Sequence, residues 1–220
     1  MPGGRLDRLQ QSVLKTLAPM NPRWTLTGGG ALVGFHLAHR ETRDLDLFWH
    51  ATAVLERRAD EVVQRLRASG LDVTVLQHDP AFARLRTVDG TEAIAVDLVA
   101  DPVPWVEPPA EAALDEVTIQ IDTRHEILVN KLCALLGRSE VRDLVDLRAL
   151  LEAGGDLERG LRDAPRKDDG FSPMTLAWVL ERFDVRRLAA SSGMEAHGAQ
   201  ALDAFRATLV DRLEHLVVSA

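Results

Sequence analysis

Apolar residues near the start of the chain follow helical spacing, and the spacing shortens to that of strands soon afterwards. Over 5–18, leucine and valine recur every three or four residues, which predicts an amphipathic helix. From residue 24 onward, short alternating runs predict strands at 24–26, 44–49 and 71–77. A further helical pattern over 53–68 separates the last two strands.

Two more strand-like runs flank the Asp-Gly dipeptide at 89–90, which is typical of a tight β-hairpin turn. Counting back from a two-residue turn at this dipeptide puts Arg84 opposite Ala95. The same count puts Arg84, Arg86 and Asp97 on one face, because side chains alternate along a strand. A proline-bearing loop and a last strand at 117–121 follow.

The remainder of the chain shows helical spacing only. The predicted helices lie at 124–136, 141–153, 172–183 and 194–218. A mixed front half and an all-helical back half predict an α+β fold with two parts, a core over 1–122 and a helical lobe over 123–220 packed on it.

Composition narrows the class of protein. The chain has 220 residues, 46% of them hydrophobic, which is typical of globular proteins. The longest apolar run is too short to span a bilayer, the N-terminus lacks the apolar segment of a signal peptide, and Cys133 is the only cysteine. We therefore expect a cytoplasmic protein without a membrane partner. The net charge of −8 argues against broad, non-specific binding of nucleic acid, so such a substrate needs a local basic patch or a small contact area.

Asp44 and Asp46 are the first candidates for chemistry. Aspartates two residues apart on a strand point the same way, and Asp97 on a neighbouring strand would complete a cluster of three. Such a cluster repels itself unless cations neutralise it, and Mg²⁺ prefers one or two carboxylates together with phosphates and water. The alternative is an exposed strand face whose charges are simply solvated.

Gly28, Gly29 and Gly30 lie between a predicted strand at 24–26 and a predicted helix at 31–38. Glycines in this position let backbone N–H groups approach a phosphate, and the helix N-terminus favours negative charge. The pattern matches neither the P-loop nor the dinucleotide-binding fingerprint. The alternative is a flexible turn.

Two helices carry charged residues inside their apolar arcs. On a helical wheel Lys131 and Asp143 fall among apolar side chains, whereas Asp146 and Arg142 fall on the outside as a pair four residues apart. Lys131 is placed to reach phosphates if its helix covers the carboxylates; otherwise its ammonium extends to solvent from the edge of the arc. For Asp143, an internal contact with Arg148 is a structural alternative.

Arg40 stands between the glycine helix and the aspartate strand, where it is placed to pair with a carboxylate or a phosphate. The neighbouring His39 is better explained as a capping or packing residue than as a metal ligand, because no second histidine or cysteine stands at ligand spacing.

Five motifs taken together resemble a known family. The segments "GGGAL", "HRETRDLDLF", "IAVDLV", "NKLCALLGR" and "VRDLVDL", in this order between Thr25 and Leu151, are similar to the AbiEii/AbiGii toxin family of nucleotidyltransferases, a branch of the polymerase-β-like superfold. The resemblance implies a small mixed sheet with helices on one side, followed by a helical C-terminal lobe. It also implies the toxin half of a toxin–antitoxin pair, with a cognate antitoxin as partner.

The resemblance assigns roles to the carboxylates. Asp44 and Asp46 become the metal-binding pair, and Asp97 corresponds to the third carboxylate of the superfold. The implied reaction is in-line attack by an acceptor hydroxyl on the α-phosphate of an NTP, with two Mg²⁺ ions stabilising the entering and leaving oxygens. Asp97 takes the hydroxyl proton in this reaction. The hairpin count, independent of the resemblance, predicts that Arg84 or Arg86 lies beside Asp97, either touching the acceptor or holding that carboxylate ionised.

The resemblance also assigns the groups that bind phosphate. Gly28 and Gly29 become the phosphate-loop glycines, Lys131 a phosphate contact and Asp143 the acid of the last motif. Relatives commonly carry a hydroxyl residue where this chain has Gly30, so a side-chain hydrogen bond to the nucleotide is missing here. The expected nucleotide-binding set consists of Gly28, Gly29, Gly30, Arg40, Arg84 and Lys131, whereas Asp143 belongs with Asp44, Asp46, Asp97 and Lys131 in the expected catalytic set.

Three functions are compatible with these features. The first is a toxin that transfers NMP to an RNA, with the acceptor end of tRNA as one possible target. The second is a member of the fold that binds a nucleotide or a partner protein without turnover, which Gly30 and the acidic surface favour. The third is a nucleotidyltransferase that modifies a small molecule.

Overall fold

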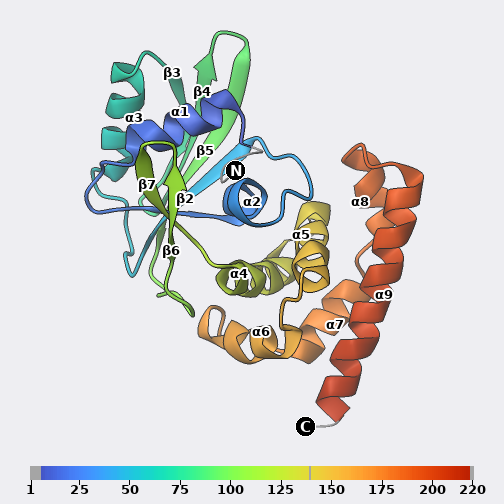
Figure 1. Ribbon diagram of the computed structural model, residues 1–220. Helices are drawn as coiled ribbons and strands as arrows, with labels where there is room; N and C mark the ends of the chain where they lie inside the picture. The colour runs from blue at the N-terminus through green and yellow to red at the C-terminus, as the bar shows by residue number, and fades with distance from the viewer. Residues whose placement is uncertain (1–5, 139, 219–220) are drawn as a thin grey trace. The chain divides into compact units, whose positions relative to one another are not determined.

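The computed structural model describes residues 6–138 and 140–218 (Figure 1). Their contacts divide the chain into two compact units, Met1–Ile127 and Leu128–Ala220. The division falls within helix α4 (Arg124–Gly137), whereas the sequence pattern predicts a boundary between residues 122 and 123, just before this helix.

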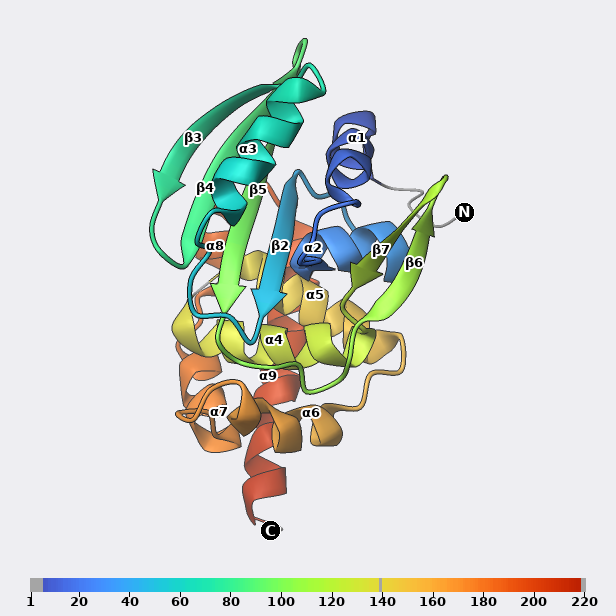
Figure 2. The ribbon, with the colours of Figure 1, turned by 90° about the vertical axis from the view of Figure 1, so that its left-hand side faces the viewer.

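The first unit contains a mixed sheet that has seven strands in the described part of the chain. They are β1 (Thr25–Thr27), β2 (Asp44–His50), β3 (Asp72–His78), β4 (Phe82–Asp89), β5 (Glu92–Asp101), β6 (Ala110–Leu114) and β7 (Val117–Ile121). Their order across the sheet is β3-β4-β5-β2-β1-β7-β6. Strand β2 is parallel to β5 and antiparallel to β1, so the strand that carries Asp44 and Asp46 lies at the centre of the sheet (Figure 2).

Helices α1 (Arg8–Leu17) and α3 (Arg58–Ala68) cover one face of this sheet, and Figure 2 shows α3 lying across β3–β5. A capping box begins α1: Asp7 accepts from the backbone N–H of Gln10, and Gln10 accepts in return from that of Asp7. The leucines and valine of the predicted apolar stripe are buried beneath the helix. The first predicted helix is therefore present, although it starts at Arg8.

The helix predicted over 53–68 also starts later than its pattern indicated, at Arg58. Before α3, the N–H of Leu55 donates to the carbonyl of Pro80 at 2.7 Å, and Glu56 has a left-handed φ of 51°. Neither feature is compatible with a continuing helix. A periodic pattern of side chains does not register such tertiary hydrogen bonds.

Alternation along the central strands separates the core from an open face. Leu45, Leu47, Leu85, Val96 and Leu98 are fully buried, and their pairing puts them on one face of the sheet. The residues at the alternate positions of these strands face the other way, and they include Asp44, Asp46, Arg84 and Asp97. The fold therefore stabilises the sheet from one side and presents polar groups from the other.

The β4–β5 hairpin turns one residue later than predicted. Asp89 pairs with Glu92, so Gly90 and Thr91 form the turn and Arg84 lies opposite Asp97, not Ala95. Gly90 has φ +57°, and glycine at the first central position is the requirement of a type II′ turn. The resulting shift of two residues in pairing keeps every side chain on its predicted face.

Strand β6 was missed because it lies within the segment interpreted as a proline-bearing loop. It pairs antiparallel with β7 at the edge of the sheet. Its sequence, "AEAAL", has little of the β-branched and aromatic content that identifies strands.

The second unit is helical throughout its described residues. It contains the end of α4, followed by α5 (Val141–Glu152), α6 (Leu157–Asp163), the 3₁₀ turn η2 (Ala164–Arg166), α7 (Pro173–Glu181), α8 (Val185–Ser191) and α9 (Ala196–Val218). Helices α6 and α8 were not predicted, because two turns are too short to show a period. Their aspartate N-caps, Asp156 and Asp184, were the available signal. No helix in residues 6–138 or 140–218 is long and apolar enough to cross a membrane.

Candidate active site

The three glycines form the first turn of a helix. Strand β1 ends at Thr27, and helix α2 (Gly28–Ala31) begins at once and continues as a π-helical turn, η1 (Leu32–His36). Gly28 has φ +57°, a conformation that glycine adopts without strain. The predicted helix at 31–38 thus starts earlier, within the glycines, and ends before Ala38.

At each of the three glycines, a side chain would approach a different neighbour. A Cβ atom on Gly28 would lie well inside 3.0 Å of the Asp46 carboxylate, and one on Gly29 would lie 2.7 Å from the Arg40 guanidinium. The backbone of the glycine turn is therefore in direct contact with one candidate metal ligand and one candidate phosphate-binding cation.

Gly30 faces the core and not these charged groups. A Cβ at this position would lie 3.1 Å from Leu26 Cδ1 and 3.3 Å from Leu45 Cδ2. A hydroxyl side chain would thus start against tightly packed apolar atoms. The consequence of this departure from the family pattern for nucleotide binding stays a prediction.

The three candidate carboxylates stand side by side on the open face of the sheet. Asp44 and Asp46 are half-buried on β2, and Asp97 on β5 pairs in register with Asp46. Because paired residues of adjacent strands point to the same side, the parallel β2–β5 ladder brings the carboxylates together. Asp97 is the most enclosed, with 8% of its surface exposed.

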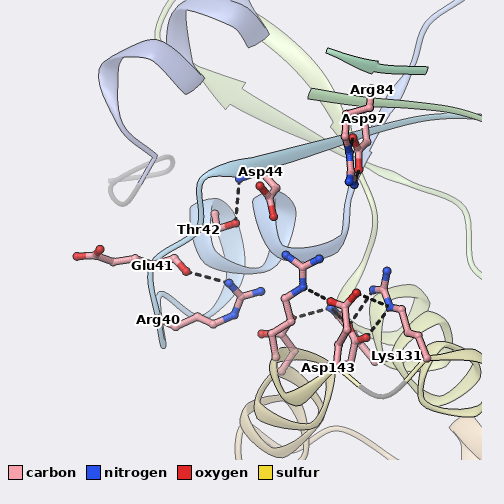
Figure 3. A network of polar contacts seen from close by, with 12 residues as sticks. Arg40, Glu41, Thr42, Asp44, Arg84, Asp97, Lys131 and Asp143 are labelled. Carbon is pink, nitrogen blue, oxygen red and sulfur yellow. Dashed lines mark hydrogen bonds and ion pairs between the residues drawn. The ribbon is translucent and has the colours of Figure 1, made fainter. Parts of the chain in front are cut away.

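Arg84 binds Asp97 through two hydrogen bonds. Its Nε donates to Oδ1 at 2.8 Å and its Nη2 to Oδ2 at 2.6 Å, from the position directly across the β4–β5 hairpin (Figure 3). These hydrogen bonds and the charge of Asp97, with smaller contributions from Asp44 and Asp46, raise the pKa of Arg84 above its ordinary value. The positive charge of Arg84 therefore acts on all three carboxylates, and the prediction that it lies beside Asp97 is confirmed.

The donor set suits a magnesium ion held by two carboxylates. Asp44 and Asp46 offer oxygen ligands from alternate positions of one strand, and Mg²⁺ commonly uses one or two carboxylates with phosphate oxygens and water. Within the described residues, no group of three or more His, Cys, Asp or Glu side chains is arranged to hold a metal ion. Both oxygens of Asp97 accept from Arg84 instead, so the role of Asp97 as a third metal ligand stays a prediction.

Arg40 lies beside the glycine turn. Its guanidinium lies against Gly29, and its Nη1 donates to the carbonyl of Glu41 at 2.8 Å (Figure 3). In the same segment, the backbone N–H of Asp44 donates to the Thr42 hydroxyl at 3.4 Å. The loop between η1 and β2 thus holds Arg40 next to the glycine turn, as phosphate binding requires.

The helical unit contains a separate, buried charge network. Lys131 Nζ on α4 lies 2.7 Å from Asp143 Oδ1 and 2.7 Å from Asp146 Oδ2, both on α5 (Figure 3). The two aspartate side chains are completely buried, and the lysine side chain is 8% exposed. The lysine therefore joins α4 to α5 through two ion pairs, and its predicted contact with a phosphate is not tested by this arrangement.

Arg138 completes the network. Its Nε and Nη2 donate to the two oxygens of Asp143 at 2.8 and 3.1 Å. Burial alone would raise the pKa of Asp143, but the hydrogen bonds from Arg138 and the charge of Lys131 hold this pKa below its ordinary value. Arg138 ends the motif "NKLCALLGR" but gave no signal in the sequence, because it follows the last residue of α4 and has no place on a helical wheel.

The prediction that Asp146 is exposed was wrong. α5 is buried over a wider arc than its apolar residues mark, and Asp146 falls inside this arc against Lys131. Arg148 pairs with Glu152 at 2.7 Å, whereas Asp143 contacts Lys131 and Arg138. A helical wheel of α5 alone does not show the counter-ion that α4 supplies to Asp146.

Replacing Gly28 by alanine tests the contact between the glycine turn and Asp46. The left-handed φ should cost about 1–2 kcal/mol of stability, and displacement of the Asp46 carboxylate should lower nucleotide transfer by about 10²-fold. Gly90→Ala is the matched control, because Gly90 also has φ +57° but nothing lies near its would-be Cβ. Thermal unfolding should shift similarly in both variants, whereas transfer should fall only in Gly28→Ala. Equal transfer rates in the two would remove Gly28 from the site.

Two solved structures of other proteins are similar to this chain over most of its length. The crystal structure of JHP933 from Helicobacter pylori is 21% identical and has a TM-score of 0.54, over 96% of this chain and 93% of that one. MenT4, a nucleotidyltransferase toxin from Mycobacterium tuberculosis H37Rv, is 16% identical with a TM-score of 0.61, over 92% and 81% of the two chains. These likenesses establish a shared fold. No curated protein matches the sequence.

A family model covers nearly all of the chain. The model of the nucleotidyl transferase AbiEii toxin, from type IV toxin–antitoxin systems, matches residues 12–215. This match confirms the resemblance and the fold class that the five motifs indicated. The chain therefore belongs to the AbiEii toxin family and is a nucleotidyltransferase.

Proposed function

We propose that this toxin transfers NMP from an NTP to a hydroxyl group of an RNA in a Mg²⁺-dependent reaction, in the cytoplasm, and that a cognate antitoxin opposes it. The observation that carries the proposal is the open face of β2 and β5, where Asp44, Asp46 and Asp97 stand in adjacent register beside Gly28. A tRNA acceptor end is one RNA that offers a terminal hydroxyl.

The chemistry is an in-line displacement at the α-phosphorus. The acceptor oxygen forms a bond to phosphorus, the bond to the bridging oxygen breaks, and pyrophosphate leaves with the electron pair. Asp97 accepts the proton of the hydroxyl group, and Arg84 orients this carboxylate through its two hydrogen bonds. Mg²⁺, held by Asp44 and Asp46, supplies positive charge for the entering and leaving oxygens when it is bound.

The triphosphate belongs at the glycine turn. The glycine backbone permits close approach of phosphate oxygens, and the Arg40 guanidinium beside Gly29 supplies charge and planar donors. For Lys131 and Asp143, the family pattern implies a phosphate contact and an acid of the last motif. We propose that these two residues act first as the ion pair that fixes α4 to α5.

Replacing Arg84 by glutamine should separate positioning from binding. The variant should keep its fold, because Arg84 is half exposed, and its kcat should fall by about 10–10²-fold as Asp97 loses its orientation. The KM for NTP should stay unchanged, and Arg84→Lys should recover part of the rate, because a lysine retains the charge but not the bidentate geometry. An unchanged kcat in steady-state transfer assays of the glutamine variant would exclude the role.

The proposed reaction is tested by incubating the purified protein with each α-³²P-labelled NTP, Mg²⁺ and total RNA. Label should enter RNA and disappear with EDTA or in an Asp44→Asn variant. Label found only in small molecules would overturn the RNA acceptor. Transfer that persists undiminished in EDTA would overturn the metal requirement.

A further inference from the structure

Cross-strand pairing arranges the open face of the sheet in rows. One row runs from Gln77 through Arg84 and Asp97 to Asp46. The next row runs from Thr74 through Arg86 and Ala95 to Asp44. The two arginines thus occupy equivalent places in neighbouring rows, each on β4 and each two strands from an aspartate of β2.

The two arginines differ in what holds them. Arg84 is engaged by Asp97, whereas the residue beside Arg86 on β5 is Ala95, which has no group to pair with. Within the described parts of the chain, the exposed side chain of Arg86 has neither a hydrogen-bond nor an ion-pair partner. Within this row only the methyl group of Ala95 stands between Arg86 and Asp44, whose Cα atoms are about 10 Å apart at two strand spacings.

A surface cavity continues this row toward the edge of the sheet. Arg86 and Thr74 line it together with Arg67 of α3, whose Nη2 donates to the carbonyl of Val73 at 2.8 Å. Asp72 also lines the cavity. The volume of the cavity is about 650 Å³. Two arginines without a carboxylate hydrogen bond therefore face one opening, a suitable setting for phosphate groups.

The topology assigns opposite sides to the two substrates. β1 and the glycine turn flank β2 on one side, and β5 followed by β4 flank it on the other. In-line displacement requires the entering and leaving oxygens on opposite sides of the phosphorus. With the triphosphate at the glycine turn, the acceptor must approach over β5 and β4.

We infer that Arg86 binds a backbone phosphate of the acceptor RNA next to the reacting hydroxyl group. This inference rests on the proposed function and adds the place and the chemical class of the acceptor contact. A guanidinium recognises a phosphodiester through paired hydrogen bonds, and Ala95 leaves room for the chain to pass between Arg86 and the carboxylates. One short contact of this kind suits a strand end bound by a protein whose net charge is −8.

Arg86→Gln tests the inference, with Arg57→Gln as its control. Arg57 is an exposed arginine that precedes α3 and lies outside the row, and its side chain has no hydrogen-bond or ion-pair partner within the described residues. The KM for total RNA should rise about tenfold or more in Arg86→Gln only, with the KM for NTP unchanged. The dependence of log affinity on log salt concentration should weaken by about one.

A binding measurement separates this contact from catalysis. Fluorescence anisotropy of a labelled single-stranded RNA oligonucleotide in EDTA should show weaker binding to Arg86→Gln than to Arg57→Gln. If the wild type does not label RNA, the proposed function fails. If it labels RNA and the two variants behave alike, only the role of Arg86 fails. A rise in the KM for NTP in place of that for RNA would assign Arg86 to the nucleotide and overturn the inference.

Discussion

Replacing Asp46 by asparagine is expected to lower nucleotide transfer by at least about 10³-fold. The Asp46 carboxylate lies against Gly28 of the phosphate turn, and Asp46 pairs in register with Asp97 of the neighbouring strand, so it connects the expected phosphate site with the other carboxylates. Asparagine keeps the shape of the side chain but removes the charge that a magnesium ion needs. Calorimetry should show the loss of Mg²⁺-dependent NTP binding in the same variant.

The same substitution should not weaken the fold. Three carboxylates on adjacent positions repel one another, and Arg84 supplies one compensating charge. Removing one carboxylate relieves part of this repulsion, so the melting temperature should stay the same or rise. Asp60→Asn, in the exposed first turn of α3, is the control for an equal charge change elsewhere. Retention of more than about a tenth of the wild-type rate by Asp46→Asn would contradict the assignment of Asp46 as a metal ligand.

The open face of the sheet was predictable from alternation alone. Asp44 and Asp46 had to share a face because they are two positions apart, which is one period of a strand. Arg84, Arg86 and Asp97 were placed correctly even though the predicted turn was wrong, since the error in pairing was an even number of residues. Alternation gives no information on the order of the strands in the sheet. The pairing of Asp97 with Asp46 therefore could not be predicted from it and is established by the structure.

The partners of buried charges were less predictable. Lys131 and Asp143 stood out because each interrupts an apolar arc, but Asp146 lies just beyond the arc and was assigned to solvent. Its burial depends on Lys131, which comes from another helix, and a single-helix projection has no information on such a neighbour. The same limit explains why Arg138, half buried and bound to Asp143, gave no signal.

Replacing Lys131 by methionine is expected to reduce the free energy of unfolding by about 3–5 kcal/mol. Lys131 is the cation within 2.7 Å of both Asp143 and Asp146, whose side chains are fully buried. Methionine fills a similar volume but leaves Asp146 without that charge in a medium of low polarity, whereas Asp143 retains Arg138. Urea denaturation of the wild type and the variant measures the difference.

A second substitution distinguishes a buried ion pair from a catalytic lysine. Replacing Asp146 by leucine in the Lys131→Met background should restore much of the lost stability, because a buried ion pair can often be exchanged for apolar side chains at little net cost. Transfer should then report on chemistry alone. If the stable double variant is inactive and binds NTP weakly, Lys131 also contacts the phosphates, as the family pattern implies. If Lys131→Met leaves the free energy of unfolding unchanged while transfer is lost, the structural role proposed for the Lys131–Asp146 pair is wrong, because a buried carboxylate that loses a cation at 2.7 Å should not be retained without a penalty.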